Sequence, residues 1–251
     1  MKCAMSNNIA NLNIKVLLMD TDFYALQAIN GYLAWDRRTR VTFMAESADS
    51  MWEYLNKTPL AELPNCILLD ADHIGGADAL RHTIQELRKR IPKVQLLCLT
   101  QSLDMALIET AAIAHINGYL LKHEVRWHIA WAIVYALKHE FVVTNTIQRK
   151  CAGLFSAHVV HPSPLPPARL YPELTDRIEQ ALRLCVIEGM PAHLAAHEMG
   201  ISLHTIRGYI KEGYRILESY DESDYPVEMT PQERAFMRFT ALQFDWDNHA
   251  P

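Results

Sequence analysis

Four polar residues in the first half of the chain stand at, or just past, the end of a short apolar run. They are Asp20, Asp70, Thr100 and Lys122. In an open parallel sheet the carboxyl ends of the strands share one edge, so these side chains are expected to meet there. Two carboxylates, a hydroxyl and an ammonium suit phosphate chemistry. Asp70 could attack phosphorus and Asp20 could hold a divalent metal, while Thr100 and Lys122 could contact phosphoryl oxygens.

The elements that would position these residues alternate regularly along the chain. Between the strand-like runs lie segments with helical spacing, such as Leu80, Ile84 and Leu87. Strands that alternate with helices of about 10–15 residues predict βαβ units and a doubly wound parallel sheet. Five strands and five helices are expected within 14–140, with the strands at 15–19, 41–45, 66–69, 94–100 and 118–121.

The second half of the chain differs from the first in composition and in its pattern of apolar residues. The proline-rich stretch 161–167 cannot form a helix interior or a central strand, because proline lacks the N–H donor. Helical sequence resumes near 174, and Thr230 followed by Pro231 begins one more helix in an acidic tail. The expected division is a flexible N-terminus (1–13), an α/β domain (14–146), a Pro-rich linker (147–172), a small all-α domain (173–218) and the acidic tail (219–251).

Residues 14–140 resemble the receiver domain of two-component response regulators, which is flavodoxin-like. The resemblance rests on the motifs that end at Asp20, Asp70, Thr100 and Lys122, and on the intervals between them. It implies that Asp70 accepts phosphate from a histidine kinase, and that Asp20, Asp70 and the backbone carbonyl of Asp72 hold magnesium. It also implies that Thr100, Tyr119 and Lys122 contact phosphate or carry the switch.

The receiver motif has three departures. The family has two adjacent acids after its first strand, and here the second is Thr21, with Asp22 opening the next helix. The loop after Asp70 lacks the usual Met-Pro, and Asp78 stands where glycine is usual. Losing one carboxylate weakens a magnesium site, because hard cations need charged oxygen ligands. Phosphorylation is therefore expected to be weak or lost.

Residues 174–217 resemble the LuxR-type helix-turn-helix output domain, most clearly from Met199 to Lys211. Gly200 makes the turn, Ser202 caps the second helix, and Ile206 and Ile210 face inward. A stripe at helical spacing then remains for DNA in the major groove. The stripe comprises His204, Arg207, Gly208, Lys211 and Arg215.

Two functions follow from the second half. The first is transcription regulation by sequence-specific DNA binding, with the chain acting as a dimer. The second is a degenerate receiver joined to a helical module that acts on protein partners. Acidic and basic residues nearly balance within 169–218, and DNA affinity depends on phosphate neutralisation, so both stay open.

The helix expected over 125–137 is apolar on two faces. Ile129, Ile133 and Leu137 would face the sheet, whereas Trp127, Trp131 and Val134 would form a second face. A helix that is apolar on more than one face usually needs a second partner. A homodimer through this face is therefore expected, with coverage from within the chain as the alternative.

Bulk properties set the remaining limits. No apolar run approaches the roughly 20 residues of a membrane span, and 1–13 lacks a signal-peptide core. The five cysteines are scattered without a Cys-x-x-Cys pair, which favours neither zinc nor disulfides and points to the reduced cytoplasm. No further pairing of a nucleophile with a base appears, so no enzyme activity beyond self-phosphorylation is expected.

Overall fold

A computed structural model of the chain describes residues 12–158, 160–220, 225–226 and 228–244. It divides into two compact units that meet in the chain between Leu165 and Pro166. Residues 1–11 of the predicted N-terminal segment, and residues 221–224, 227 and 245–251 of the acidic tail, fall outside the described residues.

The first unit contains a seven-stranded, all-parallel sheet of order β2-β1-β3-β4-β5-β6-β7. The predicted doubly wound α/β fold is confirmed, and two short strands extend it. The strands are β1 (Ile14–Met19), β2 (Thr39–Ala45), β3 (Cys66–Asp70), β4 (Gln95–Thr100), β5 (Gly118–Leu121), β6 (Val142–Val143) and β7 (Ser163–Pro164).

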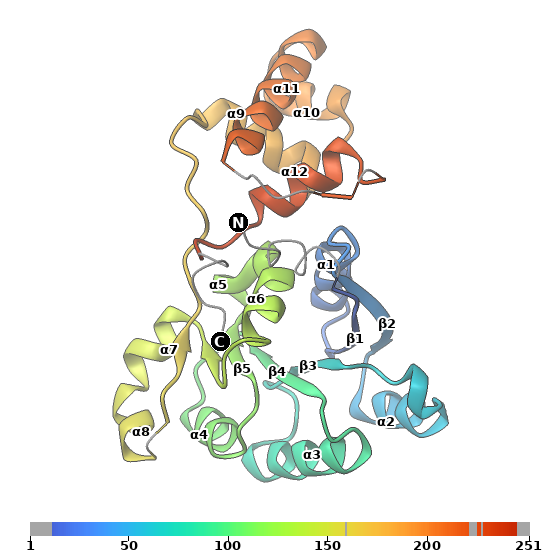
Figure 1. The fold of residues 1–251 in the computed structure, drawn as a ribbon, viewed down its shortest axis with the longest axis vertical. Helices are drawn as coiled ribbons and strands as arrows, with labels where there is room; N and C mark the ends of the chain where they lie inside the picture. Colours follow the sequence, from blue (N-terminus) through green and yellow to red (C-terminus); the bar gives the residue numbers. More distant parts are fainter. Residues whose placement is uncertain (1–11, 159, 221–224, 227, 245–251) are drawn as a thin grey trace, which may run out of the picture. The chain divides into compact units, whose positions relative to one another are not determined.

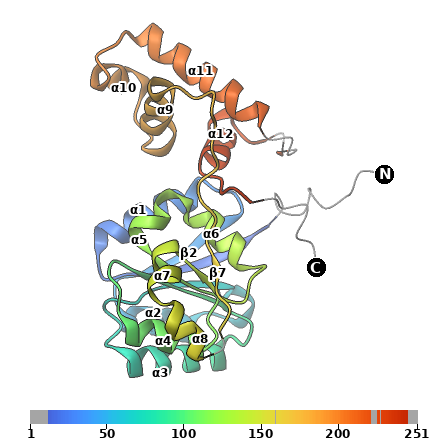
Figure 2. The same ribbon diagram turned by 90° about the vertical axis from the view of Figure 1, so that its left-hand side faces the viewer.

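Helices cover both faces of this sheet: α1 and α6 on one side, and α2, α3 and α4 on the other (Figures 1 and 2). Strands β3, β4 and β5 are buried along their whole length, as parallel strands between two helical layers must be. The helices are α1 (Phe23–Ala34), α2 (Ala48–Lys57), η2 (Leu60–Glu62), α3 (Ala77–Arg90), α4 (Met105–Ile113), α5 (Lys122–Val125), η3 (Arg126–His128), α6 (Ile129–Ala136), α7 (Asn145–Lys150) and α8 (Ala152–Ala157).

The start of the expected linker is structured. Ile147 of α7, Cys151 between the two helices and Phe155 of α8 join the core of the first unit, so this unit continues to Leu165 rather than ending at 146. Strand β7 accommodates Pro164 because only its neighbours, Ser163 and Leu165, donate backbone hydrogen bonds to the β6 side (2.8 and 2.7 Å). Proline is tolerated on such an edge strand.

The face expected to form a dimer is covered within the chain, which corrects that prediction. Trp131 is 7% exposed and Val134 is 1% exposed, and Trp127 is partly buried. The Arg38 guanidinium lies 3.7 Å from the centre of the Trp131 ring. The single predicted helix is also broken at Arg126, whose φ is +46°. Beyond that break Leu137 is 48% exposed, so it does not face the sheet.

The second unit is helical. Its elements are α9 (Asp176–Leu182), a π-helical turn η4 (Arg183–Ile187), α10 (Ala192–Glu198), α11 (Leu203–Ser219) and α12 (Pro231–Phe239). Helix α12 packs against α11 and η4, and Gln232 Nε2 donates to the Cys185 carbonyl (3.0 Å). The expected added helix is thus an integral part of this unit, and Phe236 of α12 and Leu242 just after it are buried.

The two ends of the helical unit are tied together. Arg169 N donates to Ala241 O, and Gln243 N donates to Pro167 O, both at 2.8 Å. Tyr171 Oη donates to Arg238 O (2.5 Å). Residues 167–171, expected to be linker, therefore belong to the helical unit. Among the described residues no helix is long and apolar enough to cross a membrane.

Candidate functional site

The carboxyl ends of β1, β3 and β5 bring Asp20, Asp70 and Lys122 together, as predicted. Lys122 Nζ lies 2.8 Å from Asp20 Oδ2 and 3.0 Å from Asp70 Oδ1, so the ammonium bridges both carboxylates. Both aspartate side chains are almost fully buried, and that of Lys122 is 14% exposed. Burial opposes the charge on Lys122, but its hydrogen bonds and charge interactions with Asp20 and Asp70 outweigh this and raise its pKa.

Thr100 lies at the end of β4 but is bound to the neighbouring loop. Its Oγ1 is 2.6 Å from Asp72 Oδ1 and 2.7 Å from the Ser102 carbonyl oxygen, and its single proton can serve only one of them. Asp72 Oδ2 accepts from Gln101 N at 2.6 Å. The Asp72 side chain therefore ties the loop after β3 to the loop after β4.

His73 is the site residue that sequence reasoning missed. Its Nδ1 lies 2.7 Å from Asp70 Oδ2, while Thr21 Oγ1 donates to the same oxygen at 3.4 Å. The hydrogen bond to Asp70, reinforced by its charge, raises the pKa of His73. No motif pointed to this contact, because a loop side chain's direction depends on backbone angles that residue spacing does not reveal.

Tyr119 lies on β5 with its side chain wholly inside the fold. It is 0% exposed, and its hydroxyl makes no hydrogen bond of good geometry among the described residues, although the Thr100 side chain is near enough to affect its titration. Burial raises the pKa of this phenol. The hydroxyl is therefore a neutral buried group, and leaving such a group unpaired costs stability.

The acidic edge has the ligand chemistry of a magnesium site but does not fit one. Asp20 Oδ1 accepts from Asp22 N (2.9 Å), and the oxygens of Asp70 and Asp72 have donors at hydrogen-bond distance. Asp20 Oδ2 is buried and has no partner in hydrogen-bond geometry among the described residues other than the Lys122 ammonium, 2.8 Å away. Asp22 caps α1, as expected, and so does not replace the missing acid. Within the described ranges no group of three His, Cys, Asp or Glu side chains is arranged to hold a metal.

Helix α11 presents the predicted stripe to solvent. Ser202 caps the helix by accepting from Thr205 N (3.0 Å), and Gly200 makes the preceding turn with φ +65°. Ile206 is fully buried in the core of the helical unit, with Ile210 packed against it. The members of the stripe are all exposed: His204, Arg207, Gly208, Lys211 and Arg215.

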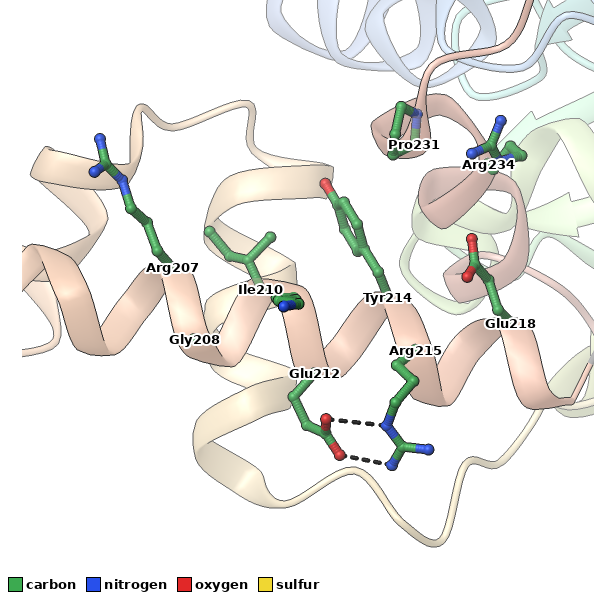
Figure 3. A pocket seen from close by; sticks show the side chains of 10 residues that line it. Arg207, Gly208, Ile210, Glu212, Tyr214, Arg215, Glu218, Pro231 and Arg234 are labelled. Atoms are coloured by element: carbon green, nitrogen blue, oxygen red, sulfur yellow. Dashed lines mark hydrogen bonds and ion pairs between the residues drawn. The ribbon is translucent and has the colours of Figure 1, made fainter. Parts of the chain in front are cut away.

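A groove of about 800 Å³ runs beside this stripe, between α11 and the start of α12 (Figure 3). Arg207 and Lys211 contribute cations to it from α11, and Arg234 contributes one from α12. Arg215 is held by Glu212 through two hydrogen bonds of 3.0 and 2.6 Å. Its charge is therefore partly compensated, unlike those of the other exposed cations of the stripe, for which no ion pair is found among the described residues.

Comparison with known proteins gives similarity in structure alone. The sequence matches no protein-family model and no curated protein. Its structure is similar to that of two RcsB dimers bound to two parallel DNAs, with 20% identity over 80% of this chain and 89% of that chain, and a TM-score of 0.47.

RcsB from Salmonella enterica serovar Typhimurium, bound to promoter rprA in the presence of the phosphomimetic BeF3−, is 17% identical. That similarity covers 92% of this chain and all of the other, with a TM-score of 0.44. A complex of the two-component response regulator RcsB with DNA is 18% identical over 89% of this chain and 97% of that chain, with a TM-score of 0.47. The chain is similar in structure, at low identity, to these RcsB structures. Its own fold is a parallel α/β sheet followed by a helical C-terminal region.

Proposed function

We propose that the chain regulates transcription by sequence-specific DNA binding through α11, with a receiver whose phosphorylation at Asp70 is weak or lost. The observation that carries the proposal is the exposed stripe on α11. Arg207 and Lys211 stand one helical turn apart and are both exposed, whereas Ile206 of the same helix is buried. That placement leaves two cations able to reach base edges and phosphates in a major groove.

The roles within the stripe differ. Gly208 has nothing within 4 Å of the position a Cβ would take, so this part of α11 allows close approach of a DNA backbone. Arg207 and Lys211 are proposed to contact bases, and His204 near the capped helix start is proposed to contact the backbone. Arg215 contributes less, because Glu212 already satisfies its guanidinium.

The chain is proposed to bind as a homodimer, since paired half-sites double the contact surface. Its interface cannot be the covered face of Trp131 and Val134. For the receiver unit, the proposed phosphoacceptor remains Asp70, with Thr100, Tyr119 and Lys122 around it. Magnesium is not assigned there, because the acidic oxygens are already engaged.

A second function is favoured by one observation. Leu194 on α10 is 50% exposed and Leu203 at the start of α11 is 38% exposed, which would suit a protein partner instead of DNA. Selection from random duplexes with the full chain separates the two. Enrichment of a motif with half-sites roughly 10 base pairs apart supports DNA binding by a dimer. Enrichment of no sequence would favour the protein partner.

A further inference from the structure

The loop between β3 and α3, residues 71–76, makes contacts around Asp70 that a receiver motif does not call for. We propose that His73 closes this acidic site by holding the Asp70 oxygen that a divalent cation would need, so that the chain's own side chains replace the ion. The proposal concerns the first unit alone and is independent of whether the second unit binds DNA.

Asp70 has no carboxylate oxygen left over. Its side chain is 0% exposed, Lys122 Nζ is at Oδ1 (3.0 Å), and His73 Nδ1 is at Oδ2 (2.7 Å). The same ammonium reaches Asp20 Oδ2 and so occupies the space between the two acids. A cation that bridged these acids would have to displace both Lys122 and His73.

The position of His73 is determined by the anchoring of its two neighbours in the loop. On one side, Asp72 is anchored to Thr100 Oγ1 and Gln101 N at the end of β4, both at 2.6 Å. On the other side, Ile74 is 8% exposed and belongs to the core of the unit. Because both neighbours are anchored, the backbone at His73 is restrained, and its ring lies on Asp70 although much of the side chain is open to solvent.

Two glycines complete the turn. Gly75 and Gly76 have φ of +94° and +93°, angles that residues with a Cβ rarely adopt. They let the chain reverse from the end of β3 into α3 within a short loop. A loop of another course would point residue 73 elsewhere, so the contact depends on the local sequence from Asp72 to Gly76.

The contact works by hydrogen bonding in either charge state of the ring. An imidazole with its proton on Nδ1 donates to Asp70 whether neutral or charged. Magnesium needs near-octahedral oxygen ligands and gives up its waters reluctantly, so an oxygen already held by a donor is a poor ligand. Removing His73 should leave that oxygen with only the long contact from Thr21 Oγ1 (3.4 Å), with Asp20 and Lys122 in place.

The experiment measures binding of Mg²⁺ alone to the full chain, by titration calorimetry and by the shift in unfolding temperature. The wild type should show no shift at about 10 mM Mg²⁺, while His73→Ala should bind about tenfold more tightly and be stabilised. His82→Ala on α3 removes an exposed histidine of the same unit and should behave as the wild type. Equal Mg²⁺ affinity in the wild type and in His73→Ala would overturn the proposal.

A second measurement does not depend on the stability of the alanine variant. The ¹⁵N resonances of the His73 ring should change in Asp70→Asn and should stay unchanged when Mg²⁺ is added to the wild type. A His73 ring that is insensitive to Asp70→Asn, or one that Mg²⁺ displaces at about 1 mM, would equally overturn it. Neither measurement involves DNA, so its outcome is separate from the test of the proposed function.

Discussion

Arg38 is a fully buried guanidinium in the turn before β2. It forms an ion pair with Asp36, which is also fully buried, through contacts of 2.9 and 2.6 Å, and it stacks on the Trp131 ring. Removing one member of a buried pair strands the other charge, which costs far more than losing a surface pair. This one side chain therefore covers the tryptophan that sequence alone places on an exposed face.

Replacing Arg38 should be the most damaging single change in this region. Arg38→Met is expected to lower the free energy of unfolding by about 3–5 kcal/mol, because Asp36 is left charged and buried. Arg40→Met, at an exposed position of β2, is the matched control and should change it by less than about 0.5 kcal/mol. Urea unfolding followed by circular dichroism measures both, and equal effects would contradict the buried-pair account.

Replacing Tyr119 should have the opposite effect on the free energy of unfolding. Tyr119→Phe removes a buried hydroxyl that makes no hydrogen bond of good geometry among the described residues, so stability should stay unchanged or rise by up to about 1 kcal/mol. Tyr24→Phe is the control, since Tyr24 is 83% exposed. A loss of more than about 1 kcal/mol in Tyr119→Phe would mean that the hydroxyl has a partner after all.

At the scale of elements, the two glycines of α11 have different surroundings. A Cβ at Gly213 would lie 2.9 Å from Leu182 of α9, so glycine here lets the two helices approach closely. A Cβ at Gly208 would meet nothing within 4 Å. Gly213 therefore serves packing within the unit, whereas Gly208 has no packing role there and lowers helix propensity.

Alanine at each position gives a matched pair of variants. Gly213→Ala should destabilise the helical unit by about 1–3 kcal/mol through overpacking. Gly208→Ala should stabilise it by up to about 1 kcal/mol through helix propensity. Thermal unfolding of the full chain, followed at a probe in the second unit, distinguishes them. Changes of the same sign in both variants would refute the close α9–α11 contact.

The strands that end at Asp20, Asp70, Thr100 and Lys122 could be predicted because apolar runs bounded by polar residues are a local signal. The stripe on α11 could be predicted for the same reason. The break at Arg126 could not, because the apolar pattern continues through a residue with positive φ. Strand β7 could not be predicted either, because proline excludes a central strand but is compatible with an edge strand.

Contacts between distant segments were the part that sequence could not give. A helical wheel places Trp131 on a face without an assigned contact. Only the fold brings Arg38, from the turn before β2, onto its ring. His73 lies three residues after Asp70, yet its contact depends on Asp72 reaching the end of β4. Such contacts depend on tertiary structure, and periodicity within one element carries no information about them.

At the scale of the whole molecule, the boundary after Leu165 predicts how the chain can be divided. A fragment of residues 12–165 should fold, whereas a fragment that ends at 145 lacks Ile147, Cys151, Phe155 and the edge strand. The loss of the Phe155 contacts alone should cost about 3–5 kcal/mol. Chemical unfolding of both fragments checks this, and equal stability would show that α7 and α8 are dispensable.

DNA binding by α11 through Arg207 and Lys211, as proposed, can be tested by the salt dependence of affinity. Binding of the full chain to its selected duplex should weaken steeply with salt. Arg207→Ala should cost about 1–3 kcal/mol and relax preference at one base position, while Arg177→Ala, an exposed arginine on α9, should change affinity little. Binding that does not vary with salt, or equal losses in Arg207→Ala and Arg177→Ala, would contradict the claim.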